Sequence, residues 1–415
     1  TNDYKDDYMC RGLWGNNLLG GSDRAPRSKG KNIPIDLAFA LHTDAGFTLD
    51  STTIGTMGIY MTNVNEGKFA SGYNRYASRD FSDIVQTQLV NDIRAQFCNE
   101  WNRRRLTNES YHEARTPEVP TLLLEFLSHQ NYDDMKFGLD PNFRFSVARS
   151  IYKGMLKFLS NRYGCPYVVQ PLPVSSIGVS FAGNEEVEIT WTPAVDELEP
   201  TAKAESFILY TRIDDGGFDN GVTISNFSRD GERYSTKVSI KPGHIYSYRI
   251  AACNEGGRSF QSETVSAGMP IDVNSEKKVL IVNNSDRVSG PAFIDTPTYA
   301  GFNNRLDSGV PDRRDIAFVG EMYEFRRDME FITNDNPGFG ASYTDQVGTI
   351  VAGNSFDYPY IHGKAVFEAG YPFYSCCNET FCSDSTYRMD AWAADIICGK
   401  QVTTVVGKGS RPQAY

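Results

Sequence analysis

Histidine is scarce in this sequence, and long hydrophobic runs are missing from it. Five of the 415 residues are histidine, so each one can be weighed as a candidate for chemistry. No apolar run approaches the roughly 18 to 20 residues that cross a bilayer, and residues 1–30 lack the apolar stretch of a signal peptide. We therefore expect no membrane span in this chain.

Basic clusters and paired cysteine motifs are also lacking. The net charge is −11 and the longest basic run is Arg103–Arg105, which argues against nucleic-acid binding. The eight cysteines form no CxxC motif. A disulfide stays open for the C-terminal cluster, and we expect thiols elsewhere; the cluster consists of Cys376, Cys377, Cys382 and Cys398.

The residues that are present describe a folded, turn-rich protein. Hydrophobic residues make up 40% and charged residues 22%, with 36 Gly, 23 Tyr and 25 Phe, a composition that is common in secreted proteins with β-structure. The length favours two to four domains. Because the sequence opens on TNDYKDDYMC without a methionine, we expect that an N-terminal piece precedes it.

Residues 1–166 alternate between strand and helix patterns. The apolar run Ile33–Leu41 predicts a strand covered on both faces, and Thr121–Leu124 predicts a second buried strand. Between them, an apolar residue recurs every fourth position from Phe81 to Trp101, which predicts a helix capped at Asp80 or Ser82. A final helix is predicted from the cap Asp140 and Pro141 to Gly164, with its apolar stripe on Phe145, Ala148, Ile151 or Tyr152, Met155 and Leu159. This rhythm indicates an α/β sheet domain.

Residues 167–270 have a different character. A linker rich in proline, PYVVQPLPVSS (166–176), precedes alternating strands over 177–267. Trp191 in an early strand, Ile240 before the KPGH turn and Tyr246 at the position of a tyrosine corner carry a resemblance to a fibronectin type III module. The resemblance implies a β-sandwich that serves as a spacer or binding platform, in a multidomain protein outside the cytoplasm.

Residues 271–415 predict an α/β accessory domain that is cut short. The strand KKVLIVNN (277–284) ends in polar residues, as first strands of α/β domains often do. VGTIVAG (347–353) and the helix-like AWAADIIC (391–398) fit the same class. The glycine-rich NPGFGAS is not followed by GK[ST], so we interpret it as a turn and not as a phosphate-binding loop.

Two side chains stand at the predicted strand ends of the first domain. His42 follows the first apolar run and Glu125 follows the second. Ligands of open α/β sheets bind beyond the carboxyl ends of the strands, so the two side chains are expected to share one edge of the sheet. An imidazole that binds a metal, beside a carboxylate that moves protons, suits a zinc hydrolase. A satisfied histidine and a solvated glutamate are the alternative.

The same residues resemble a known enzyme family. DLAFALHTDAG looks like the "SLHAN" segment of zinc-dependent N-acetylmuramoyl-L-alanine amidases of the amidase-3 type, and VPTLLLEFLSHQNYDDM looks like their "P-x-x-L-x-E-x-x-F-x-S-N-x-x-D" segment. The match covers roughly residues 30–163, including the closing helix. It implies that His42 is a zinc (Zn2+) ligand, that Glu125 is the catalytic carboxylate and that peptidoglycan is the substrate.

The resemblance is incomplete upstream. The family carries two further zinc ligands, a histidine in a "DPGHGG" stretch and a glutamate on the next helix, and residues 1–30 contain neither His nor Glu. Either those elements precede this sequence, which we favour, or the chain is a degenerate amidase fold that only binds. His129, His112 and Asp44 are possible cleft-lining residues; a turn residue and an exposed loop residue are the alternatives for His129 and His112.

Three functions from different classes follow for this multidomain α/β plus β protein. The leading one is a periplasmic, secreted or cell-surface zinc amidase acting on peptidoglycan or another bacterial glycan. The second is a non-catalytic glycan-binding or scaffold protein. The third is polysaccharide processing, since the three-part layout also resembles secreted Bacteroidetes proteins called xanthan lyase-like; no tandem helical array of a true lyase is visible. The aromatic-rich segment 356–375 suits sugar stacking or a packed core.

Overall fold

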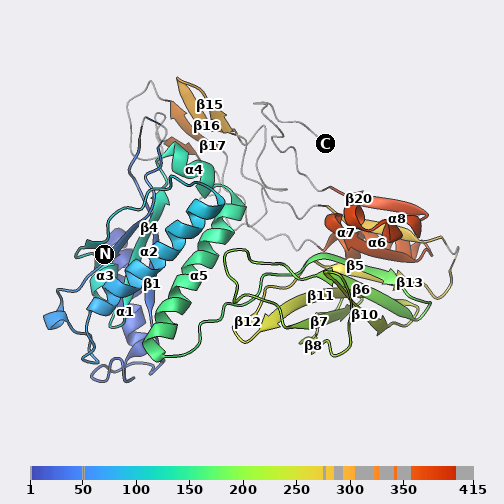
Figure 1. Cartoon of the computed structure of the whole chain (residues 1–415), viewed down its shortest axis with the longest axis horizontal. Coiled ribbons are helices and arrows are strands. Elements are labelled where there is room, and N and C mark those ends of the chain that lie inside the picture. Colours follow the sequence, from blue (N-terminus) through green and yellow to red (C-terminus); the bar gives the residue numbers. More distant parts are fainter. Residues whose placement is uncertain are drawn as a thin grey trace.

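The computed structural model describes residues 2–48, 50, 52–273, 277–284, 293–303, 322–326, 341–343 and 357–398. It has mixed α/β content (Figure 1). An α/β domain forms the N-terminal part, and a mainly antiparallel sheet of many strands follows it. No helix within these ranges is both long and apolar enough to cross a membrane.

The N-terminal sheet has four strands in the order β1-β4-β2-β3. Their bounds are β1 (Ala38–Asp44), β4 (Thr121–Ser128), β2 (Met57–Tyr60) and β3 (Thr107–Asn108). β1 and β4 are parallel, whereas β2 runs antiparallel to β4. The expected strand at Ile33–Leu41 was wrong in its bounds and its burial. Pairing starts at Ala38 opposite Thr121, and Leu41 is 56% exposed because β1 is the edge strand of the described sheet.

Helices cover both faces of this sheet (Figure 1). On one face α2 (Tyr76–Gln96) and α5 (Pro141–Tyr163) pack side by side over Leu122 and Leu124. On the other face α3 (His112–Arg115) brings Ala114 against Leu123, and α1 (Asp3–Leu19) packs on α3. A short 3-10 helix, η1 (Asn65–Gly67), and α4 (Tyr132–Gly138) lie in the connections.

The helix predictions held best where local signals were strong. Asp140 caps α5 by accepting a bond from the Asn142 N–H, and Gly164 ends it in the left-handed conformation at φ 64°. The predicted stripe of α5 was correct at Ile151, which is buried, and at Met155 and Leu159, which pack partly buried against the same core. It was wrong at Phe145 and Ala148, which are exposed, and it missed the buried Phe143, Val147 and Phe158.

The prediction for α2 was correct in its stripe and wrong in its start. Phe81, Val85, Leu89 and Ile93 are buried as predicted. The helix begins at Tyr76 without a side-chain cap, so Asp80 and Ser82 lie inside it. Trp101 lies beyond the helix end, where its ring N–H donates to Thr56 at 2.9 Å.

A β-sandwich follows, in which Trp191, Ile240 and Tyr246 lie where the fibronectin type III resemblance predicts them. Its strands are β5 (Ser175–Phe181), β6 (Glu186–Thr192), β7 (Ser206–Ile213), β8 (Val222–Thr223), β9 (Ser228–Asp230), β10 (Arg233–Ser239), β11 (His244–Asn254), β12 (Gly257–Arg258) and β13 (Val265–Met269). Trp191 and Ile240 are buried in one core. The Lys241 N–H donates to the Tyr246 hydroxyl at 3.1 Å, which is the contact of a tyrosine corner.

The third block shares the sheet and the core of this sandwich. Three parallel strands, β14 (Val279–Asn283), β19 (Phe373–Cys377) and β20 (Ala393–Ile397), lie with helices α6 (Tyr358–Glu368), α7 (Asn378–Ser383) and α8 (Ser385–Met389). β19 also pairs with β5 and β13. The strand expected in KKVLIVNN is confirmed. The helix expected at 391–398 was wrong, because Ala393–Ile397 extends alongside β14.

A second part of the block lies against the N-terminal domain (Figure 1). Its antiparallel sheet consists of β15 (Phe293–Asp295), β16 (Tyr299–Asn303), β17 (Met322–Arg326) and β18 (Ala341–Tyr343). The Tyr132 hydroxyl donates to the Ile294 carbonyl at 2.9 Å, and the Tyr132 and Phe302 rings are 5.5 Å apart. VGTIVAG and most of NPGFGAS lie outside the described residues.

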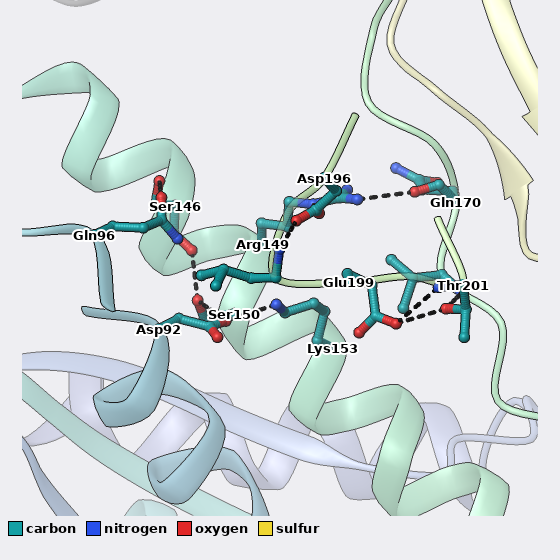
Figure 2. A network of polar contacts seen from close by, with 12 residues as sticks. Asp92, Gln96, Ser146, Arg149, Ser150, Lys153, Gln170, Asp196, Glu199 and Thr201 are labelled. Carbon is teal, nitrogen blue, oxygen red and sulfur yellow. Dashed lines mark hydrogen bonds and ion pairs between the residues drawn. The ribbon is translucent and has the colours of Figure 1, made fainter. Parts of the chain in front are cut away.

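A polar network joins α2 and α5 to the sandwich (Figure 2). Arg149 of α5 pairs with Asp196 at 2.7 Å and donates to the Gln170 carbonyl at 3.1 Å. One turn further along α5, Lys153 pairs with Asp92 of α2 at 2.8 Å. The N-terminal domain and the sandwich therefore meet at fixed polar contacts.

Candidate active site on the N-terminal sheet

His42 and Glu125 are neighbours on adjacent strands. The expectation that each follows its strand was wrong, because His42 lies inside β1 and Glu125 inside β4. Pairing of β1 with β4 continues past the apolar runs, and in it His42 is the register partner of Glu125. Partners on adjacent strands point to the same face of a sheet, so both side chains lie on the face that carries α3.

Glu125 has the environment of a carboxyl group that exchanges protons. It lies between His42 on β1 and Met57 on β2. Burial raises the pKa of Glu125 above its ordinary value, against the opposing effect of the nearby His42. Its Oε2 atom is buried and has no hydrogen-bond partner within the described part of the chain. A raised pKa and a carboxylate oxygen that is free to accept a hydrogen bond suit general acid–base chemistry.

Glu113 completes the group and was missed by the sequence analysis. Its Oε2 atom is 2.9 Å from His42 Nε2, and its side chain is only 10% exposed. The other oxygen, Oε1, accepts a bond from Arg11 at 3.0 Å. Glu113 belongs to the short helix α3, far from His42 in the sequence, so no spacing pattern links the two. Its position beside His112 in NESYHEARTP was the only signal.

Asp44 and His129 lie at the carboxyl end of β1. Asp44 pairs with Arg104 at 2.5 Å. Burial opposes ionisation of Asp44, but the bonds from Arg104 and from the Ala45 N–H, together with the charges of Arg104 and His129, outweigh burial and lower the pKa of the carboxyl. The His129 backbone N–H donates to the Asp44 carbonyl, and His129 Nδ1 lies 3.0 Å from the Thr43 hydroxyl. Both residues thus stand at the rim above His42.

The other histidines lie apart from this group. His112 turns its ring toward Tyr8 of α1 and contacts Thr116 at 3.3 Å. Burial, helped by the charge of Arg115, lowers its pKa. His244 pairs with Asp214 on the sandwich, and His362 pairs with Asp395 in the third block.

A cavity runs along the edge strand beside His42. It has a volume of about 260 Å³ and is lined by Arg11, Gly12, residues 38–42, Glu113, Pro117 and Thr121. His42 itself is 31% exposed there. The imidazole is therefore accessible from this cavity.

The side chains near His42 have the right kinds of donor atom for zinc, but there are too few of them. Imidazole nitrogen and carboxylate oxygen are both zinc ligands, and a catalytic site uses three protein ligands. Within the described ranges, three ligand atoms from His, Cys, Asp or Glu side chains lie within 4.8 Å of one another in one group only, which is Glu263, Cys377 and Glu379. The described residues near His42 thus supply fewer than three.

The cysteines form no disulfide, and Cys376 is a buried thiol. All eight are free, so the disulfide left open for the C-terminal cluster is absent and the thiols expected elsewhere are confirmed. Burial raises the pKa of the Cys376 thiol to about 12. Such a thiol remains protonated and unreactive at neutral pH.

No family model and no curated protein matches the sequence. Similar solved structures include the N-acetylmuramoyl-L-alanine amidase of Clostridium difficile 630, with 17% identity and a TM-score of 0.27 over 37% of this chain and 65% of that one. The N-acetylmuramyl-L-alanine amidase Ami1 of Mycobacterium smegmatis has 19% identity and a TM-score of 0.27, over 37% of this chain and 61% of that one. The third fibronectin III domain of human KIAA0343 protein has 13% identity and a TM-score of 0.20, over 24% of this chain and 84% of that one. The chain thus spans less than two thirds of the two amidases, and similarities this low carry no functional weight.

Proposed function

We propose that the N-terminal domain is a zinc-dependent amidase that hydrolyses the bond between N-acetylmuramic acid and L-alanine in peptidoglycan. The observation that carries the proposal is the pairing of His42 with Glu125 on adjacent strands, with the Glu125 Oε2 atom buried and without a partner among the described residues. The resemblance of both strands to amidase-3 segments supports it.

Glu125 is assigned the proton transfers. Its carboxylate accepts a proton from the attacking water molecule and then returns it to the nitrogen of the leaving L-alanine. Burial raises the pKa of Glu125 above its ordinary value, which favours the protonated form that acts as the acid of the second step.

His42 is assigned the role of a zinc ligand. Zinc, when bound, would polarise the amide carbonyl and make water a better nucleophile. The cavity of about 260 Å³ beside His42 is the route that the proposal gives the substrate to the imidazole. Peptidoglycan as the partner places the protein in the periplasm or at the cell surface, an assignment that belongs to the proposal.

The test is digestion of purified peptidoglycan with zinc present. We expect new L-alanine amino termini with the wild-type chain and a fall of roughly 100-fold or more for Glu125→Gln, the range for loss of a general acid–base group. Glu109→Gln is the matched control, since Glu109 is an exposed residue of the same domain. Equal rates for wild type and Glu125→Gln would reject the assignment.

A second candidate is a glycan-binding protein on the same fold. It is favoured by the small number of ligands near His42 in the described part of the chain. It predicts that the chain co-sediments with peptidoglycan and releases no amino termini at any zinc concentration.

A further inference from the structure

Three possible metal ligands meet where the third block joins the sandwich. Cys377 is the last residue of β19, and Glu379 lies two residues further on, in the first turn of α7. Glu263 comes from the sandwich, in the segment that leads into β13. One ligand atom of each residue, a sulfur and two carboxylate oxygens, lies within 4.8 Å of the other two. The group therefore brings together two parts of the chain that are far apart in sequence.

The fold explains why these residues meet. β14 and β19 are parallel, and Asn283 at the end of β14 is the register partner of Cys377. Ligand sites of α/β sheets lie beyond the carboxyl ends of such strands. The Asn283 side-chain amide donates to Glu263 Oε2 at 2.7 Å, and this bond holds the carboxylate of the sandwich beside the strand ends.

The surroundings of the Cys377 sulfur suit a bound cation. The side chain is 1% exposed, and its Sγ atom lies 3.4 Å from the Thr380 hydroxyl oxygen. Burial, and after it the charge of Glu263, raises the pKa of the thiol above its ordinary value. A buried sulfur that faces carboxylates thus stays protonated without a cation, whereas a thiol that coordinates a metal ion loses its proton.

The donor atoms select the kind of cation. A thiolate is a soft ligand that favours zinc over magnesium and calcium, and carboxylate oxygens also bind zinc. In a tetrahedral zinc site with bonds of about 2.0–2.3 Å the ligand atoms are about 3.3–3.8 Å apart, so small side-chain movements close this group on the ion. Asn378, between the two ligands of the third block, has a buried Oδ1 atom without a partner among the described residues, which is one sign of an ion-binding place.

We propose that Glu263, Cys377 and Glu379 form a zinc-binding site that joins the third block to the sandwich. Binding releases the thiol proton to solvent and involves no redox step. The thiolate and the two carboxylates then carry three negative charges, which the divalent cation largely compensates. This site is separate from His42 and independent of the proposed hydrolysis.

Cobalt titration of the metal-free full chain tests the site, because a cysteine that binds cobalt gives a sulfur-to-metal charge-transfer absorption. We expect this absorption to saturate at a single cobalt ion per chain and to disappear when zinc replaces the cobalt. A metal bound by imidazole and carboxylates alone gives no such absorption, so the proposed amidase site does not contribute to the signal. Absence of the absorption in the wild-type chain overturns the inference.

Variants assign the signal to the three residues. Cys377→Ser should remove the absorption, and Glu263→Gln and Glu379→Gln should each weaken cobalt binding by at least the roughly 10-fold that loss of an outer partner costs. Glu379 is exposed, so its variant folds even if Cys377→Ser does not. Cys382→Ser and Glu368→Gln, at exposed positions of the same block, are the controls. Unchanged affinity in Glu379→Gln, or loss of the absorption in Cys382→Ser, overturns the inference.

Thermal unfolding tests whether the metal joins the two parts. A ligand that binds only the folded state raises the unfolding temperature, so zinc should raise the Tm of the sandwich more in the wild-type chain than in Glu379→Gln. An equal rise in the two chains contradicts the joining role.

Discussion

Removing Asp92 should destabilise the N-terminal domain strongly. The Lys153 ammonium is 2% exposed and the Asp92 carboxylate 8%, at 2.8 Å from each other. Asp92→Asn removes the charge that compensates Lys153, and leaving one partner of a buried pair uncompensated costs about 3–5 kcal/mol. For a domain of this size about 3 kcal/mol lowers the Tm by roughly 6 to 12 °C.

The double variant makes the expectation specific to the ion pair. Asp92→Asn with Lys153→Met removes both charges, and apolar replacement of a buried pair is often neutral. We therefore expect it to unfold at a higher temperature than Asp92→Asn alone. Ser150 and Gln88, which both donate to Asp92, keep an acceptor in the new asparagine.

Calorimetry of the full chain is the assay, with the transition of the N-terminal domain as the readout. Asp83→Asn on the same helix is the control, because Asp83 pairs with Arg103 at the surface and an exposed pair is worth about 0–1 kcal/mol. A loss no larger than that of the control would refute the reasoning. So would a double variant less stable than Asp92→Asn.

Three further predictions concern single residues. Burial raises the pKa of Asp134 to about 6, so the folded state binds a proton more tightly than the unfolded state. The free energy of unfolding should therefore fall as pH rises from about 4 to 6. A series of Tm measurements that shows the same fall in Asp134→Asn would contradict this. Tyr246→Phe removes the acceptor of the Lys241 N–H and should cost the sandwich about 1 kcal/mol, seen in its Tm, with hydrolysis unchanged. Gly363→Ala would place a Cβ atom at 2.1 Å from Cε2 of the buried Phe373 ring, so its Tm should fall by more than that of Lys364→Ala.

The bounds of α5 could be predicted because the signals are local. Asp140, Pro141 and Gly164 each act on the backbone within a few residues of themselves, and the structure uses all three. Which face of α5 is buried depends instead on where α2 and the sandwich lie. For this reason Phe145 is exposed, whereas Phe143 is buried in the core.

Strand bounds depend on partners, and this limited the prediction for β1 and β20. β1 begins where Thr121 offers a partner and not where the apolar residues begin. For Ala393–Ile397 the short apolar run is compatible with helix or strand. Pairing with β14 made it a strand, and that pairing spans more than a hundred residues of sequence.

The candidate site shows the same division between local pattern and tertiary contact. His42 and Glu125 could be singled out because each follows an apolar run that forms most of a strand, and parallel pairing then aligned them in register. Glu113 gave no such signal, since its distance from His42 depends on α3 lying across the sheet and on Arg11 of α1 holding one of its oxygens. The surroundings of His42 are therefore set by two helices that its own strand pattern does not reveal.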